Sequence, residues 1–189
     1  MRLTILIFTF FLLTNGFLIG QTNDSLVKVI DTKYKNVKEN LENYEKVIVE
    51  NNEESTEGGQ ENAYYEGQTL IFIELIWYGE TGKKILEYYF DNGQLIFAFD
   101  QEFTYNRPIY WDEKKSKEMG DNEVFDSNKT IINQDRYYFN DELIFLWLDN
   151  EKNEIDLTMG TNTLIGKGLI AHAYKMKDKF SFPAVAPRK

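Results

Sequence analysis

The chain has 189 residues, of which 42% are hydrophobic and 28% are charged, and its formal net charge at pH 7 is −10. This many hydrophobic residues can form a core, which argues against disorder along the whole chain. The negative charge argues against binding to nucleic acid or to anionic lipid, because both are negatively charged themselves. The chain contains no cysteine, which excludes thiol catalysis, cysteine-based metal sites and a lipid anchor on an N-terminal cysteine.

Residues 1–20 are typical of a secretory signal peptide. One basic residue, Arg2, precedes an apolar run from Leu3 to Leu13, which is the order that signal peptides have. A retained membrane anchor is the alternative, but a span needs about 20 apolar residues, and threonine and asparagine interrupt this run. We therefore predict a signal peptide that is cleaved after Gly16 or after Gly20.

The remaining residues, 21–189, are expected to form a single α+β domain outside the cytoplasm. An exported chain that lacks cysteine and has far more lysine than arginine is typical of a periplasmic or secreted bacterial protein. We expect no stable membrane span after processing.

An amphipathic helix is predicted from Ser25 to Glu50. Its apolar residues recur at alternating steps of three and four, and Asn23 or Asp24 can cap its start. The stripe consists of Val27, Ile30, Tyr34, Val37, Leu41, Tyr44 and Ile48. A partner-binding helix or a coiled coil is the alternative, but the stripe lasts little more than three heptads. We therefore expect the helix to pack on a sheet.

The next segments are predicted as a linker and a buried strand. The acidic segment Asn51–Gln60 contains two adjacent glycines and no apolar residue, as linkers do. Thr69–Tyr78 is an almost continuous run of β-branched and aromatic residues, which is typical of a strand covered on both faces. A turn at Gly79–Gly82 follows.

Two similar phrases indicate two copies of one β-hairpin. Tyr88–Asp100 reads YYFDNGQLIFAFD and Tyr137–Asp149 reads YYFNDELIFLWLD, which align with a gap of one residue. Asn92-Gly93 is the preferred pair for a two-residue turn with positive φ at both positions. This turn predicts that Phe97 and Phe99 share a face with Tyr88 and Phe90. Because the loop of the second copy is one residue shorter in this alignment, we expect the second hairpin to differ from the first, either by a shifted register or by a longer, irregular loop.

The rest of the chain is predicted as a long connection and a second helix. The polar connection formed by residues 101–134 is unusually long for a compact domain, and such connections are either functional or mobile. Thr161–Phe180 has apolar residues at near-helical spacing, weakened by two glycines. The predicted fold class is therefore α+β: an antiparallel sheet of about five to seven strands, with the long N-terminal helix packed on it and a C-terminal helix.

The strongest candidate for a binding site is a cluster in the connection, which consists of Tyr105, Arg107, Tyr110 and Trp111. Arginine and large aromatic residues dominate recognition hot spots. The alternative is that the cluster covers one end of the sheet and that Arg107 pairs with a nearby carboxylate.

No arrangement of residues predicts a reaction, a metal site or a cofactor. His172 is the only histidine, and no serine occurs in a Gly-x-Ser-x-Gly context. Paired carboxylates could hydrolyse a glycosidic bond, but candidates such as Glu74, Glu87 and Glu123 have no distinguishing context. We expect no catalytic residue, no metal and no cofactor.

Several short motifs of the chain carry a resemblance to known proteins. They are EESTEGGQ (Glu53–Gln60), YGETGK (Tyr78–Lys83), EYYFDNGQLIF (Glu87–Phe97), YNRPIYWDE (Tyr105–Glu113), and RYYFNDELI and LWLDN within Arg136–Asn150. With these motifs, the stretch from Glu54 to Asp149 resembles a family of uncharacterised secreted proteins from Bacteroidetes. The hairpin phrases are also similar to the YYxNGxL units of MORN-like proteins. The resemblance implies an exported α+β protein and no particular reaction.

The resulting expectation is a non-catalytic binding module of the cell envelope, whose partner is a protein or a glycan and not nucleic acid. Two alternatives stay open. One is a glycan hydrolase with paired carboxylates, and the other is an inhibitor that binds a cationic secreted enzyme through negative charge.

Overall fold

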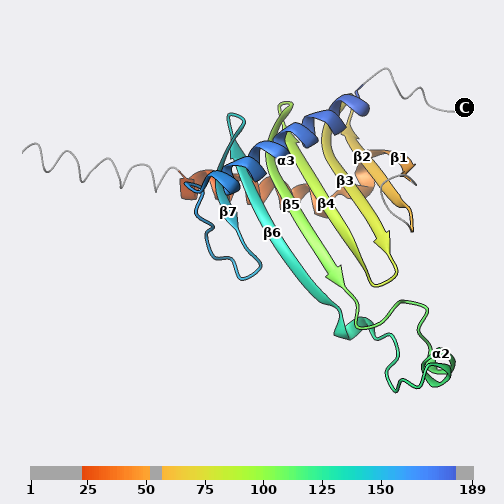
Figure 1. The fold of residues 1–189 in the computed structure, drawn as a ribbon. Coiled ribbons are helices and arrows are strands. Elements are labelled where there is room, and N and C mark those ends of the chain that lie inside the picture. Colours follow the sequence, from red (N-terminus) through yellow and green to blue (C-terminus); the bar gives the residue numbers. More distant parts are fainter. Residues whose placement is uncertain (1–22, 52–56, 182–189) are drawn as a thin grey trace, which may run out of the picture. The chain divides into compact units, whose positions relative to one another are not determined.

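The computed structural model describes residues 23–51 and 57–181 (Figure 1). The expected signal peptide and its cleavage sites lie outside the described residues. The chain divides into two compact units, Met1–Glu39 and Asn40–Lys189, and the described part of the first is a helix over residues 23–39. The packing of this helix on the sheet and the expectation of a single domain stay predictions.

The N-terminal helix is shorter than the sequence pattern predicted. It ends at residue 39, and the 3₁₀ turn η1 (Leu41–Asn43) leads into strand β1 (Glu45–Asn51). The prediction of a helix up to Glu50 is therefore wrong. Val47, Ile48 and Val49 are β-branched and favour a strand. Val47 and Val49 pack against the core, whereas the side chain of Ile48 is 53% exposed.

Seven strands form one antiparallel sheet in which each strand pairs with the next along the chain. After β1 come β2 (Gly59–Glu66), β3 (Thr69–Gly79), β4 (Gly82–Asp91), β5 (Gln94–Thr104), β6 (Ile131–Asn140) and β7 (Leu143–Leu148). Helix α3 (Gly160–Lys179) crosses one face of this sheet (Figure 1). The predicted α+β class with two helices and an antiparallel sheet is confirmed.

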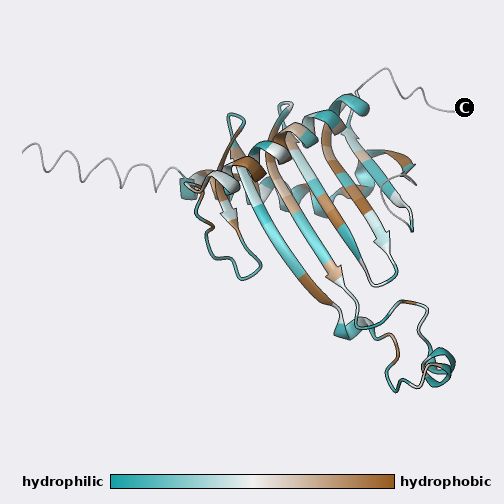
Figure 2. Cartoon of the chain, in the orientation of Figure 1, coloured by the Kyte–Doolittle hydropathy of each residue, from teal (hydrophilic) through white to brown (hydrophobic). Residues whose placement is uncertain are grey.

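Helix α3 covers the hydrophobic core of the sheet and approaches it closely. In Figure 2 the strands carry hydrophobic segments, whereas the short helix α2 (Glu113–Glu118) is hydrophilic. Ala173 and Met176 of α3 are buried in this core. A Cβ atom at Gly166 would lie 2.6 Å from Cγ2 of Ile144 in β7. Glycine at this position therefore allows the close approach of helix and sheet.

The hairpin between β4 and β5 has the predicted turn but not the predicted register. Asn92 has φ of 49° and Gly93 has φ of 78°, so positive φ at both positions is confirmed. Tyr89 pairs with Phe97, but Phe90 pairs with Leu95, so one residue on β5 is extra, as in a β-bulge. Phe97 and Phe99 therefore share a face with Tyr89, opposite the face of Tyr88, and the predicted assignment is wrong.

The hairpin between β6 and β7 has the same register as the hairpin between β4 and β5. It has a two-residue turn, Asp141-Glu142, with φ of 47° and 60°, and its register shifts at the same place, between Tyr138 and Phe139. The predicted difference between the two hairpins is therefore wrong. Phe90 pairs with Leu95 in the first hairpin, and Phe139 pairs with Ile144 in the second. Ile144 is therefore the counterpart of Leu95, and with this match the two phrases align without a gap.

Candidate functional site

The connection between β5 and β6 extends from one end of the sheet and carries α2 (Figure 1). Strands β5 and β6 pair up to Thr104 and Ile131, so the connection is shorter than predicted and comprises residues 105–130. It contains α2 and the 3₁₀ turn η2 (Ser127–Lys129). We call residues 105–130 the distal loop.

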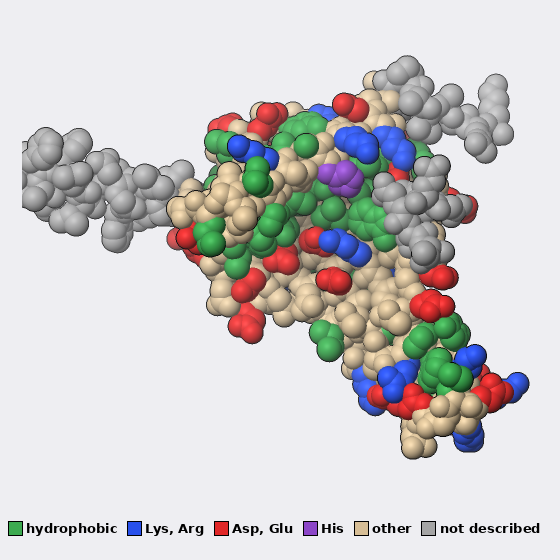
Figure 3. Space-filling view, in the orientation of Figure 1, with side chains coloured by type: hydrophobic (Ala, Val, Ile, Leu, Met, Phe, Trp, Pro, Cys, Tyr) green, Lys and Arg blue, Asp and Glu red, His purple; other side chains and the backbone are tan. Residues whose placement is uncertain are grey.

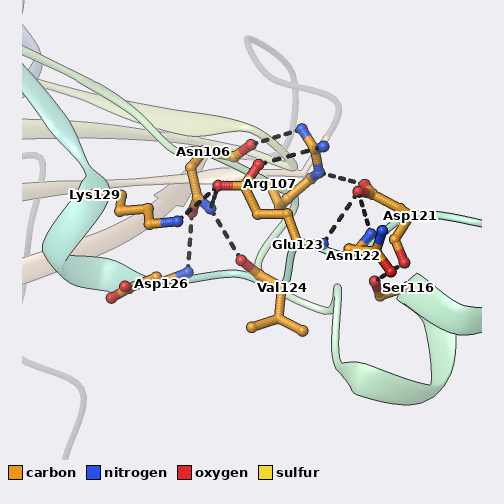
Figure 4. A network of polar contacts seen from close by, with 9 residues as sticks. All are labelled: Asn106, Arg107, Ser116, Asp121, Asn122, Glu123, Val124, Asp126 and Lys129. Carbon is orange, nitrogen blue, oxygen red and sulfur yellow. Dashed lines mark hydrogen bonds and ion pairs between the residues drawn. The ribbon is translucent and has the colours of Figure 1, made fainter.

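Arg107 ties the beginning of the distal loop to its middle (Figure 4). Its Nε donates a hydrogen bond of 2.8 Å to Oδ2 of Asp121, and its Nη2 lies 3.4 Å from Oε2 of Glu123. Its Nη1 also donates to the backbone oxygen of Asn106 at 3.2 Å. The guanidinium group is therefore used inside the loop, as the alternative interpretation of the sequence expected.

Asn106 holds the second half of the distal loop (Figure 4). Its Nδ2 donates to the backbone oxygen of Val124 at 2.9 Å and to Oε1 of Glu123 at 3.1 Å, while its Oδ1 accepts from the backbone N–H of Asp126 at 3.0 Å. Lys129 donates to the same Glu123 oxygen at 2.9 Å. One side chain thus bridges segments about 20 residues apart, and the ring of Tyr105 packs edge-on against Phe125 across the same loop, so that both contacts fix its two halves together.

The charges of this network shift the pKa values of its carboxyl groups. The hydrogen bond from Arg107 lowers the pKa of Asp121. The hydrogen bonds from Lys129 and Asn106 lower the pKa of Glu123. Both carboxyl groups are solvent-accessible, so salt and water screen these interactions. The network therefore orders the loop more than it stabilises the protein.

A hollow of about 220 Å³ lies where the distal loop meets the turn between β3 and β4. The distal loop is bonded to this turn by its backbone: Tyr105 N–H donates to the Thr81 oxygen at 2.8 Å, and Ile109 N–H donates to the Glu80 oxygen at 3.3 Å. The hollow is lined by Glu57, Tyr78, Gly79, Glu80, Gly82, Tyr105, Ile109 and Tyr110. We call it the distal hollow. Figure 3 shows hydrophobic side chains gathered where the strands meet the distal loop.

The glycine at position 82 is required by the close packing of this turn. A Cβ atom there would lie 2.1 Å from the backbone oxygen of Phe103, which is far inside van der Waals contact. Any other residue at position 82 would push β4 and β5 apart. Gly82 thus lets the turn sit directly against the start of the distal loop.

The polar groups of the distal hollow are acidic or neutral. The hydroxyl of Tyr110 donates to Oε1 of Glu80 at 3.1 Å. Partial removal from water raises the pKa of Tyr110, and the hydrogen bond to Glu80 and the charge of Glu57 add to this effect. Among the described residues that line the hollow, none is a lysine or an arginine.

The structure brings together two of the four predicted binding residues. Tyr105 and Tyr110 line the distal hollow, whereas Arg107 belongs to the loop network and Trp111 lies outside the lining. The Nε1 of Trp111 is buried and has no hydrogen-bond partner within the part of the chain that is described. Tyr78 and Glu80 were not predicted as site residues, although the two glycines that flank Glu80-Thr81 indicate a tight turn there.

A second polar cluster lies beside α3, and we call Asp100 and Asp135 the aspartate pair. They are direct neighbours across β5 and β6, where Cβ atoms are about 5 Å apart. Trp147 donates to Asp135 at 2.7 Å. Burial raises the pKa of Asp100 and the charge of Asp135 adds to this, although the 2.8 Å ion pair with Lys84 opposes the shift. Figure 3 shows acidic and basic side chains together on this face, next to hydrophobic ones.

The carboxylates considered from the sequence have mainly structural contacts. Glu74 and Glu87 are direct neighbours across β3 and β4. Glu87 is only 1% exposed and accepts a 2.6 Å hydrogen bond from Tyr89, while Glu74 accepts from Asn62 at 2.7 Å. Glu123 belongs to the loop network. The two carboxyl groups of the aspartate pair were therefore not among the candidates named from the sequence.

The single histidine is part of the contact between α3 and the sheet. Nδ1 of His172 lies 2.8 Å from the hydroxyl of Tyr88 in β4. In residues 23–51 and 57–181, no group of three or more histidine, aspartate or glutamate side chains is placed to hold a metal ion. The helices in these ranges are too short or too polar to cross a membrane.

Comparison with known proteins places the chain in no family. No family model matches it, and neither a curated protein nor a solved structure does. The resemblance to secreted proteins of Bacteroidetes and to MORN-like units therefore stays a prediction.

Proposed function

We propose that the chain is an exported, non-catalytic binding module of a bacterial envelope, and that it contacts a protein or glycan partner through the distal hollow. The signal-like residues 1–20 and the resemblance to secreted proteins support export. The two matching hairpins, at Tyr88–Asp100 and Tyr137–Asp149, support their interpretation as copies of one unit that builds the scaffold for this site.

The observation that carries the proposal is the exposure of apolar and aromatic side chains at an ordered position. Ile109 is 59% exposed, Tyr110 is 51% exposed and Tyr78 is 43% exposed, and all three line the distal hollow. Exposed aromatic residues in a rigid setting are typical of binding hot spots, because little conformational entropy is lost when a partner orders them. The network around Arg107 and Asn106 supplies that rigidity.

Capture of partners from the native envelope tests this proposal with a matched pair of variants. The double variant Ile109→Ser with Tyr110→Ala removes the exposed apolar surface of the hollow. Leu164→Ser in α3 removes an equally exposed apolar side chain elsewhere, since Leu164 is 66% exposed. We expect the double variant to capture at least about tenfold less partner, as loss of hot-spot residues does, and Leu164→Ser to capture as much as the unaltered chain.

Equal loss of capture in both variants, or none in either, would contradict the distal hollow as the contact site. Circular dichroism of each variant shows whether it is folded. Because all three side chains are largely exposed, their replacement leaves the fold intact.

A glycan hydrolase is the second candidate, and the aspartate pair is the observation that favours it. Retaining glycosidases place two carboxyl groups close together and raise the pKa of one of them, and Asp100, with its raised pKa, is the direct cross-strand neighbour of Asp135. The ion pair between Lys84 and Asp100 counts against this function, because it favours the charged form of Asp100 and opposes the rise of its pKa. Turnover of a glycan panel by the unaltered chain, abolished in Asp100→Asn and in Asp135→Asn, would establish the hydrolase and refute the non-catalytic module.

A further inference from the structure

We infer that the distal hollow binds a positively charged ammonium group carried by the partner, such as a lysine side chain or a quaternary ammonium. This inference rests on the proposed function and adds the chemical class of the ligand. The volume of about 220 Å³ far exceeds the roughly 15 Å³ that one water molecule needs. The hollow therefore has room for an organic group rather than only for a bare ion or a single water.

The aromatic lining favours a cation. Tyr78, Tyr105 and Tyr110 all line the same hollow, and the face of each tyrosine ring carries negative potential. Several rings around one space attract an ammonium group, and they do so most strongly when its methyl or methylene groups contact the rings. A neutral alkyl group of the same shape gains only the apolar contact.

The carboxyl groups of the hollow add a second, independent attraction. Glu80 and Glu57 line it. Glu80 accepts one hydrogen bond from Tyr110 at 3.1 Å, whereas a carboxylate can accept about four. The nearby Lys83 lies over the ring of Phe103 at 4.6 Å and does not line the hollow. An anionic ligand would face two carboxyl groups and no lysine or arginine in the described lining, so the electrostatics select against phosphate and carboxylate groups.

Titration of the purified exported chain, followed by two-dimensional NMR of backbone amides, tests the ligand class. The probes are tetramethylammonium chloride, N-acetyl-lysine methylamide and tert-butanol, the last as a neutral molecule of similar shape, with sodium chloride matching the ionic strength. We expect saturable shifts of the Gly79, Thr81, Gly82 and Ile109 amides with one or both cationic probes and none with tert-butanol. The tighter of the two cationic probes identifies the source of the ammonium group.

Two variants and a control variant test whether the cationic probe binds in the distal hollow. Glu80→Gln keeps the size of the side chain and removes its charge, and Tyr110→Leu removes one ring and keeps an apolar side chain. Each is expected to weaken binding of the cationic probe about three- to tenfold, the range for one cation–π or partly exposed charge contact. Glu118→Gln in α2 removes a charge from an exposed side chain outside the hollow and is expected to change nothing.

Binding of tert-butanol as tight as that of tetramethylammonium would overturn the inference and leave the hollow as an apolar binding site. Absence of binding by every probe would also overturn it. Neither result decides the proposed function, because partner capture by the Ile109→Ser and Tyr110→Ala chain is measured separately.

Discussion

The two ends of the sheet are held together by different forces. Under α3 the strands bury large apolar side chains, such as Phe139 at 1% exposure and Tyr88 at 0%. The distal loop instead depends on Arg107, Asn106 and the carboxyl groups that they contact, most of them in contact with water. Apolar burial is strong and insensitive to charge, whereas exposed ion pairs are weak and respond to salt and pH. The apolar core can thus keep the sheet stable, while the conformation of the distal loop is set by polar contacts that leave its apolar side chains exposed to a partner.

The largest expected effect is loss of a buried ring under α3. Phe139→Ala leaves a cavity in the core and is expected to lower the free energy of unfolding by about 3–5 kcal/mol. Ile109→Ala at the distal hollow is expected to change it by less than about 0.5 kcal/mol, because that side chain is already exposed. Urea unfolding followed by circular dichroism measures both, and similar losses in the two variants would refute the contrast between the two ends.

Alanine substitutions at three glycines compare how closely the backbone is packed at the two ends of the sheet. Gly82→Ala is expected to destabilise the protein by about 1–3 kcal/mol, because its Cβ meets backbone that can move only with the strand. A Cβ atom at Gly168 in α3 would have no neighbour within 4 Å. Gly168→Ala is therefore expected to stabilise the protein by about 0.5–1 kcal/mol, because alanine favours the helix more than glycine does. Gly166→Ala should fall between them, since its Cβ meets the side chain of Ile144. Thermal unfolding midpoints in any other order would contradict these packing arguments.

The two ends should also respond to opposite extremes of pH. The pKa values of Asp121 and Glu123 are lowered from 3.8 and 4.5, so their contribution is present above these values and is lost as the pH falls below them. Burial raises the pKa values of Tyr88 and Tyr137 above 10.0, and the nearby aspartates add to this. Their contribution is complete below pH 10.0 and is lost as the pH rises above it.

Amide resonances separate these two transitions. Between pH 5 and pH 3, the side-chain amide of Asn106 should move toward its unfolded position while the near-ultraviolet circular dichroism of the buried tyrosines stays unchanged. Above pH 10, the backbone amide resonance of Ala98 should move to its unfolded position, and the near-ultraviolet circular dichroism of the tyrosines should be lost over the same pH range. Simultaneous loss of both signals in acid would mean that the distal loop and the core are one cooperative unit.

The smallest effect is expected for Arg107→Gln. The exposed guanidinium contributes little to global stability, so the unfolding midpoint should stay nearly constant. Hydrogen exchange of residues 105–130 should nevertheless become faster, because the loop loses three contacts of this side chain. Unchanged exchange in the loop would show that Asn106 alone is sufficient to order it.

Local chemistry allowed part of the fold to be predicted from the sequence. The Asn92-Gly93 turn depends only on the φ preferences of two adjacent residues, and the C-terminal helix depends on a 3.6-residue pattern within one segment. The strand at Thr69–Tyr78 was visible for the same reason, as a local run of β-branched and aromatic residues. Two residues of the distal hollow, Tyr105 and Tyr110, could be predicted because they cluster with Trp111 near Arg107 in the sequence.

Tertiary pairing decided the rest. The end of the N-terminal helix at residue 39 depends on β1 finding β2 as a partner, which outweighs the continued apolar spacing. The register beyond Leu95 depends on a bulge at Ile96, and a bulge leaves little trace in the alternation of residues. Arg107 meets Asp121 and Glu123 only because α2 folds the chain back, so its contacts are set by loop geometry. Short-range preferences are carried by neighbouring residues, whereas burial, register and charge pairing are properties of segments that meet only in the folded protein.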